Sequence, residues 1–327
     1  MKRRDFIGLI GGAAVWPVAA SALPENRVTR VGILWHAPNE LEEAPFPTVL
    51  REGLRDLGYT EGKNIVLLNT FAADNYDLFK ENAERLVASQ VDIIVAINLR
   101  AAQAAQKATQ TIPIVFVFVG DPVAYKLVNS FAHPGGNITG LSQIAEDLTA
   151  KRLEILKNAA GVSRAALLVN PSNAQFALKS IEETHSAATS LEMLVTPIEV
   201  ARAEELDGAF ARMASTGFNA AVVVSDSMFW TERKRIAELA LQSRIATIFA
   251  MRDHVDAGGL ISYGPSLSAL VRRVAAYIDK LIKGERAGDI PVERPTRIEL
   301  VVNLKVARSL GIDIPKTIIG TADDVID

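Results

Sequence analysis

Short aliphatic runs alternate with amphipathic stretches along most of this 327-residue chain. The strongest run, at 112–120, reads IPIVFVFVG and places its proline near the strand start, where a missing backbone donor is tolerated. Such runs are typical of parallel strands that are buried on both faces. The stretches between them repeat apolar residues three or four positions apart, as in Leu50, Leu54 and Leu57, which predicts helices that cover a sheet.

The alternation has one clear break, at 133–137, where the sequence reads HPGGN. On both sides of this break, strand starts recur roughly every 25 to 30 residues, the spacing of βα units. The two halves also open alike, with RVGIL at 30–34 and RAALL at 164–168. The sequence therefore predicts an α/β fold with two doubly wound parallel-sheet lobes. The predicted strands are 28–35, 65–71, 91–98, 112–120, 164–170, 193–198, 220–225, 245–249, 260–263 and 297–303. The predicted helices are 47–57, 76–89, 101–109, 175–190, 206–215, 232–243, 252–257, 267–282 and 304–310.

The C-terminal part departs from this alternation. A long helix at 267–282 is followed by a proline-rich stretch at 291–295 and a late strand. Elements that follow two complete halves indicate that the chain crosses back and forth between the lobes, which makes a hinge of two or three strands. We expect lobe 1 to comprise residues 28–139 plus 265–288, and lobe 2 to comprise residues 140–264 plus 289–327.

The first 22 residues have the layout of a secretory signal. Lys2, Arg3 and Arg4 precede an apolar stretch at 6–16, which is too short to span a membrane. The sequence ASA at 20–22 supplies a small-residue cleavage site, so we expect cleavage after Ala22 and a periplasmic location. Two arginines before Phe-Ile resemble the twin-arginine export signal, with a general secretion signal as the alternative.

Composition excludes several classes of protein. Hydrophobic residues make up 49% and charged residues 22% of the chain, which is an ordinary globular balance. The formal net charge of −3 includes the basic leader, so the body of the chain is more acidic still and is unsuited to general nucleic-acid binding. The absence of cysteine excludes disulfides, zinc–thiolate sites, iron–sulfur clusters, cysteine nucleophiles and an N-terminal lipid anchor.

Polar and aromatic residues gather where predicted strands end and helices begin. Ligands of open α/β sheets bind at these carboxyl ends, where the free N–H groups of helix starts favour an anion. Asp121 or Asp226 could accept hydrogen bonds from a ligand ammonium group, and Trp35 and Tyr263 could cover an apolar ligand body. Helix capping is the competing interpretation for the Asp, Asn and Ser positions. The candidate ligand-binding residues are Trp35, His36, Asn98, Arg100, Asp121, Asn170, Ser225, Asp226 and Tyr263.

The sequence carries no recognisable catalytic motif. The four histidines stand apart, without the spacing of a zinc hydrolase, and no serine-nucleophile elbow, Walker loop or dinucleotide fingerprint is present. We therefore predict that the protein is not an enzyme and needs no cofactor or metal. An acid–base pair built from Asp121 and Asp226 is the remaining alternative.

Four ordered motifs, at 110–123, 133–140, 259–264 and 295–305, resemble the ABC transporter substrate-binding family whose better-known members are linked to aromatic amino acid uptake. The resemblance runs from about residue 28 to the C-terminus. It implies a type I periplasmic-binding fold whose two lobes close on a ligand, after which the closed form docks on a membrane permease. By the same resemblance, Asp121, Asn170 and Asp226 would contact the ligand, with Tyr263 near the hinge.

One position departs from the family pattern. Where many relatives have a small Gly-Thr/Ser-Pro-Ala turn after the third strand, this chain has NLRA at 98–101. Arg100 either pairs with a ligand carboxylate or faces solvent, and the second interpretation is favoured. The altered turn leaves the identity of the ligand open.

These observations predict an exported solute-binding protein of an ABC importer. It would capture an amino acid or related carboxylate between two lobes and deliver it to an ABC permease in the inner membrane. The alternatives are a ligand-sensing periplasmic protein for a membrane receptor and an exported α/β enzyme. A DNA-binding regulator of the same fold is excluded, because an export signal occupies the place of its N-terminal DNA-binding domain. We expect a monomer, because each lobe completes its own core.

Overall fold

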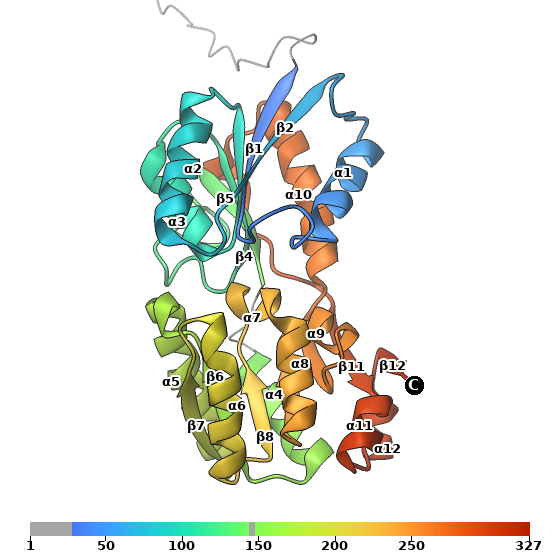
Figure 1. Cartoon of the computed structure of the whole chain (residues 1–327). Helices are drawn as coiled ribbons and strands as arrows, with labels where there is room; N and C mark the ends of the chain where they lie inside the picture. Colours follow the sequence, from blue (N-terminus) through green and yellow to red (C-terminus); the bar gives the residue numbers. More distant parts are fainter. Residues whose placement is uncertain (1–27, 144–147) are drawn as a thin grey trace, which may run out of the picture.

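The computed structural model describes residues 28–143 and 148–327, which form two α/β lobes stacked end to end (Figure 1). The signal predicted at 1–22 lies outside the described residues. None of the helices in the described part of the chain combines the length and the apolar character that a bilayer-spanning helix requires.

The first lobe is built on a five-stranded parallel sheet with the order β2-β1-β3-β4-β5. Apolar residues of α1 and α10 cover one face, and those of α2 and α3 cover the other. The strands are β1 (Thr29–Trp35), β2 (Ile65–Phe71), β3 (Ile93–Ile97), β4 (Ile114–Val119) and β5 (Ile138–Ser142). The helices are α1 (Phe46–Asp56), α2 (Tyr76–Ala88), α3 (Leu99–Ala108) and α10 (Leu267–Ile282).

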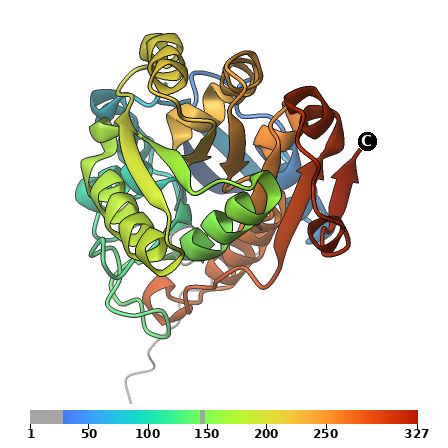
Figure 2. The same ribbon diagram turned by 90° about the horizontal axis from the view of Figure 1, so that it is seen from below.

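The second lobe repeats this order as β7-β6-β8-β9-β10 and adds β11, antiparallel to β10, and β12 at the edge. Viewed from below, this sheet has helices on both faces (Figure 2). Its strands are β6 (Arg164–Val169), β7 (Leu194–Glu199), β8 (Ala220–Val223), β9 (Ala246–Phe249), β10 (Ile261–Pro265), β11 (Ile298–Asn303) and β12 (Asp324–Ile326). Its helices are α4 (Thr149–Ala160), α5 (Ala174–Ser190), α6 (Leu206–Ser215), α7 (Ser227–Thr231), α8 (Arg233–Gln242), α9 (Arg252–Asp256), α11 (Leu304–Leu310) and α12 (Lys316–Ile319).

The predicted fold class is confirmed. The aliphatic runs form the strands of two mostly parallel sheets, and the apolar residues of the predicted helices pack on those sheets. The long helix at 267–282 has the predicted bounds. The sequence analysis missed β5, α4, α7, α12 and β12. Strand β5 reads ITGLS, in which a glycine and two hydroxyl residues weaken the aliphatic signal.

The chain passes between the lobes at three places. It leaves the first lobe after β5 and returns directly from β10 into α10, with only Ser266 between the two elements. The third passage follows α10, where the Ser142 amide donates to the carbonyl of Glu293 and Thr139 donates to the carbonyl of Ile290. The returning segment is therefore bonded along β5, next to the first passage.

Candidate ligand-binding site

A cavity lies between the lobes, at the carboxyl ends of the central strands, with an empty volume of about 570 Å³. Side chains of both lobes line it, as the doubly wound architecture predicts. The lining residues are His36, Phe46, Asn98, Leu99, Arg100, Phe118, Gly120, Tyr125, Gln143, Asn173, Phe176, Ser225, Asp226, Ser227, Trp230, Met251 and Leu267.

One wall of the pocket is a cluster of aromatic rings from both lobes. The ring of Phe46 lies 5.3 Å from that of Phe118 and stacks at 5.2 Å on Trp230, which comes from the other lobe. Phe118 is placed by a bulge, since its φ is +62° and the pairing of β4 with β5 shifts register between Val117 and Val119. This wall of the pocket is therefore apolar, and its rings are packed against one another.

The turn between β8 and α7 forms the second lobe's polar contribution. Asp226 caps α7 by accepting from the backbone N–H of Met228 at 3.0 Å. The same carboxylate accepts from the amide nitrogens of Asn170 at 3.0 Å and Asn173 at 3.4 Å. Ser225 donates to the Oε1 atom of Gln143 at 3.2 Å. The turn is thus held by its own hydrogen bonds.

The first lobe contributes a cation through the start of α3. Asn98, at φ +94°, caps this helix by accepting from the backbone N–H of Ala101. The first turn of α3 brings Arg100 to the pocket, and the Nη1 atom of Arg100 donates to the backbone carbonyl of Asp74 at 3.0 Å. Its Nη2 atom is buried and has no hydrogen-bond partner. A buried donor without a partner is costly, so this atom favours a ligand that supplies an acceptor.

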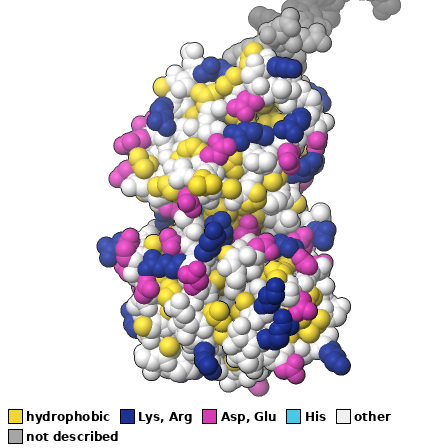
Figure 3. All heavy atoms as spheres, turned by 45° about the vertical axis from the view of Figure 1, so that its right-hand side comes forward, with side chains coloured by type: hydrophobic (Ala, Val, Ile, Leu, Met, Phe, Trp, Pro, Cys, Tyr) yellow, Lys and Arg dark blue, Asp and Glu magenta, His cyan; other side chains and the backbone are white. Residues whose placement is uncertain are grey.

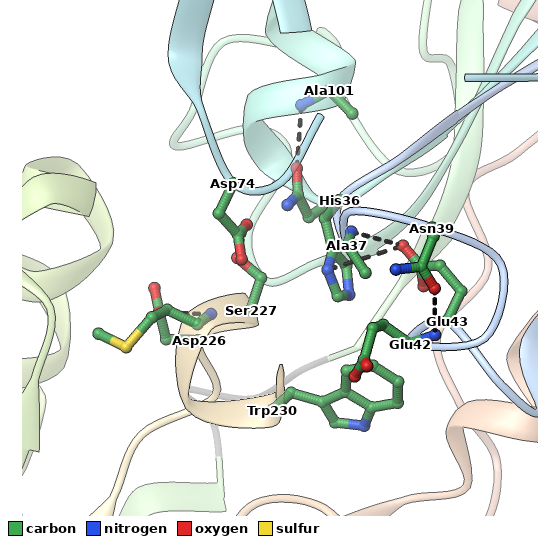
Figure 4. A network of polar contacts seen from close by, with 12 residues as sticks. His36, Ala37, Asn39, Glu42, Glu43, Asp74, Ala101, Asp226, Ser227 and Trp230 are labelled. Atoms are coloured by element: carbon green, nitrogen blue, oxygen red, sulfur yellow. Dashed lines mark hydrogen bonds and ion pairs between the residues drawn. The ribbon is translucent and has the colours of Figure 1, made fainter. Parts of the chain in front are cut away.

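Asp74 lies where the lobes meet, partly buried in the loop between β2 and α2. Figure 4 shows its carboxylate facing Ser227 of the other lobe, whose hydroxyl donates to it. Burial, together with the negative charge of Asp226, raises the pKa of Asp74 to about 6. The charges of His36 and Arg100 act in the opposite direction without cancelling the effect.

A buried acid supports the loop beside the pocket. Glu43 is fully buried and accepts from the backbone N–H of Ala37 at 2.8 Å (Figure 4). It also lies 3.7 Å from the Nδ1 atom of His36. The His36 ring in turn meets Trp230 edge-on, with 5.4 Å between the ring centroids. This arrangement fixes the position of His36 at the cavity wall.

Several contacts join the two lobes around the pocket, so the structure shows them closed. Lys179 of α5 lies 3.2 Å from Asp121, which follows β4 in the first lobe. Burial alone would raise the pKa of Asp121, but hydrogen bonds from backbone N–H groups and the charge of Lys179 hold it below its usual value. Trp230 and Phe176, both from the second lobe, pack into the apolar clusters of the first.

The structure brings five of the nine predicted residues to the pocket: His36, Asn98, Arg100, Ser225 and Asp226. Arg100 lies at the cavity wall, whereas the favoured interpretation placed it in solvent. The other four predicted residues lie elsewhere.

Trp35 is fully buried in the core of the first lobe and donates to Asn69, because its position in β1 directs the indole away from the cavity. Tyr263 packs on the core of the second lobe, and its carbonyl accepts from Arg152. Asn170 lies behind Asp226 and lines an outer cavity. Asp121 holds Lys179 at the rim instead of meeting Asp226, so the suggested acid–base pair has no support in the geometry.

Sequence analysis missed the aromatic wall and the polar lining residues Gln143, Asn173 and Ser227. Phe118 lies inside the strongest predicted strand, so the sequence gives no sign that its side chain turns toward the pocket. Trp230 and Phe229 are adjacent in α7 but belong to apolar clusters of different lobes. Within the described ranges, 28–143 and 148–327, no group of three or more His, Asp or Glu side chains is placed to hold a metal ion.

Comparison with known proteins identifies the family. The model of the ABC transporter substrate-binding proteins matches residues 48–326, which is most of the chain. The chain belongs to this family. The predicted resemblance is therefore confirmed, and the family consists of binding proteins.

Individual relatives of this substrate-binding chain are distant but extensive. A tyrosine-binding protein of Clostridioides difficile is 25% identical over 277 residues, which cover 83% of this chain and 79% of the relative. A solved structure of a conserved domain protein from Vibrio cholerae is 26% identical, with a TM-score of 0.85 over 91% of this chain and 100% of the other.

A second solved structure, from Streptococcus, was determined in complex with L-Trp. It is 24% identical, with a TM-score of 0.82 over 91% of this chain and 99% of the other. More distant neighbours include a protein described as periplasmic binding protein/LacI transcriptional regulator. The fold is the type I periplasmic-binding fold, as predicted.

Proposed function

We propose that this protein is the exported binding component of an ABC importer and captures a small aromatic carboxylate, an amino acid or a related acid, between its lobes. The observation that carries the proposal is the pocket itself, which both lobes line and whose lining includes aromatic rings and an arginine with one buried nitrogen that has no hydrogen-bond partner. The relatives support an aromatic ligand, since one is named a tyrosine-binding protein and another was solved with L-Trp.

Export and delivery complete the proposal. The basic and apolar layout of residues 1–22 supports twin-arginine export to the periplasm, with cleavage after Ala22. Membership of the substrate-binding family supports an ABC permease in the inner membrane as the partner. In this account the ligand binds the closed form better than the open form, and the permease recognises the closed surface.

We propose that lobe 1 comprises residues 28–139 plus 265–288 and that lobe 2 comprises residues 140–264 plus 289–327. The packing of α10 against α1 and the pairing of β11 with β10 support this division. Strand β5 continues in the first sheet as far as Ser142, which makes the boundary there part of the hinge.

Figure 3 shows charged side chains of both signs spread over one face of both lobes.

Thermal unfolding of the chain from residue 23 onward tests the proposed function. The panel should contain aromatic amino acids, aromatic organic acids, aliphatic amino acids, sugars and nucleosides. A ligand at a hundred times its dissociation constant stabilises the folded protein by about 2.7 kcal/mol. We expect at least one aromatic carboxylate to raise the unfolding midpoint by several degrees.

The ligand recovered from the complex should be chemically unchanged. Stabilisation by a sugar or nucleoside alone would contradict the proposed ligand class. Conversion of the ligand would replace the binding function with an enzymatic one.

A further inference from the structure

Several hydrogen-bond acceptors of the pocket already have donors within the protein, whereas one of its donors has no acceptor. Among the described residues, Asp226 supplies the only carboxylate in the lining, and it already accepts three hydrogen bonds from Met228, Asn170 and Asn173. A carboxylate offers about four acceptor positions, so roughly one is left. The side-chain oxygens of Gln143 and Asn98 also have donors of their own.

The guanidinium of Arg100, by contrast, has a donor without an acceptor. The Nη1 atom of Arg100 is engaged with the carbonyl of Asp74, but Nη2 is buried without a partner. A ligand carboxylate would satisfy this atom through a charge-assisted hydrogen bond, which is among the stronger polar contacts in proteins. A ligand ammonium group has three donors, and among the described lining residues the oxygens of Asp226, Gln143 and Asn98 already accept from donors of the protein. Burying donors without acceptors disfavours such a ligand.

We infer that the pocket selects an aromatic organic acid without an ammonium group, a hydroxy or keto acid, over the corresponding α-amino acid. The inference rests on the proposed function and narrows the ligand class of the same site. In this arrangement the carboxylate would lie at Arg100 and the aromatic body beside Phe118, which lines the pocket together with the edge of the Phe46–Trp230 stack.

Matched ligand pairs test this selectivity, because they differ only at the group in question. Each pair replaces the ammonium of an amino acid by a hydroxyl: phenylalanine and phenyllactate, tyrosine and 4-hydroxyphenyllactate, tryptophan and indole-3-lactate. We expect isothermal titration calorimetry at pH 7.5 to show tighter binding of the hydroxy acid in the best-binding pair, by about tenfold or more.

Variants of Arg100 connect the selectivity to the structure. Arg100→Gln should weaken binding of the preferred hydroxy acid by about tenfold to a hundredfold, the usual cost of losing a hydrogen bond to a charged group. Arg100→Lys keeps the charge without the fork of donors and should lie between Gln and Arg. Lys107→Gln removes a cation from the exposed face of the same helix and should leave the affinity unchanged. Thermal unfolding of each variant shows whether it is folded.

The possible outcomes separate this inference from the function on which it rests. If the amino acid of the best-binding pair binds as tightly as its hydroxy acid, or more tightly, the inference is wrong and the proposed function stands. If folded Arg100→Gln retains full affinity, the inference is also wrong, because the carboxylate lies elsewhere. If no member of any pair binds, both the inference and the proposed aromatic ligand are wrong.

Discussion

Asp74 lies at the contact between the lobes, where its charge is expected to affect closure. Its carboxylate accepts from Ser227 of the other lobe and lies near a second carboxylate, that of Asp226. Opening the lobes would return Asp74 to water, where an aspartate titrates near about 3.9. In the closed structure its pKa is about 6. Closure therefore takes up protons between about pH 4 and pH 6.

We predict that ligand affinity falls as the pH rises from about 4 to 6 and is level above about 7. The sign follows from the raised pKa, because protonated Asp74 favours the closed form and that advantage disappears as the pH passes the higher value. Asp74→Asn keeps an acceptor for Ser227 and should flatten the profile, with higher affinity than the natural protein at pH 7.5. Calorimetric titrations across this range measure the effect.

The other groups that face Asp74 are His36, Asp226 and Arg100. These three side chains are unchanged in Asp74→Asn, so any pH dependence of affinity that the variant keeps comes from groups other than Asp74. If the variant keeps the full pH dependence, Asp74 is not the group that links protons to closure.

At the scale of the element, the short helix α7 brings Ser227 and Trp230 of the second lobe to the lining of the pocket. Asp226 caps it, Ser227 reaches across to the first lobe, and Trp230 packs into the first lobe's apolar cluster. A helix of five residues gains little from its own backbone hydrogen bonds, so its position depends on the cap and on these contacts.

Asp226→Ala should therefore lower the free energy of unfolding by about 1–2 kcal/mol and weaken ligand binding by about tenfold or more. The substitution removes the cap and leaves the amides of Asn170 and Asn173 without their acceptor. Chemical denaturation and calorimetric titration measure the two effects.

Asn75→Ala is the matched control, because Asn75 caps α2 by accepting from two backbone N–H groups and lies outside the pocket. It should cost a similar stability without changing the affinity. An equal loss of affinity in both variants would show that capping, and not the site, governs binding.

The elements could be predicted from the sequence because their signals are local. The bounds of Leu206–Ser215, Leu267–Ile282 and Leu304–Leu310 follow from apolar spacing within single helices. The pocket could be predicted only in part. Most of its polar side chains stand at the ends of predicted strands or directly after them, where a ligand is expected, but its aromatic side chains share no such position in the sequence. Phe118 depends on a bulge, and Trp230 depends on contact with Phe46 across more than half the chain, neither of which has a local pattern.

At the scale of the whole molecule, the repeated strand order gives two lobes that can move about their crossings. The contacts that close the cleft are of two kinds: polar pairs such as Lys179 with Asp121 and Ser227 with Asp74, and the apolar packing of Trp230 and Phe176 on the first lobe. Exposed ion pairs contribute only about 0–1 kcal/mol each. A bound ligand that adds contacts to both lobes therefore changes the balance between open and closed forms.

The distance across the mouth of the cleft is the most direct test of capture by closure. Pro38 of the first lobe and Glu204 of the second are both exposed and line the same outer cavity. Because the natural chain has no cysteine, Pro38→Cys and Glu204→Cys would place two spin labels without interference. Pulsed electron paramagnetic resonance then gives the distance distribution between the labels. We predict a broad distribution at longer distances without ligand, and a single narrow peak at a shorter distance once the best-binding aromatic carboxylate saturates the protein. An unchanged distribution with ligand bound would contradict the account, because the ligand would then bind without bringing the lobes together.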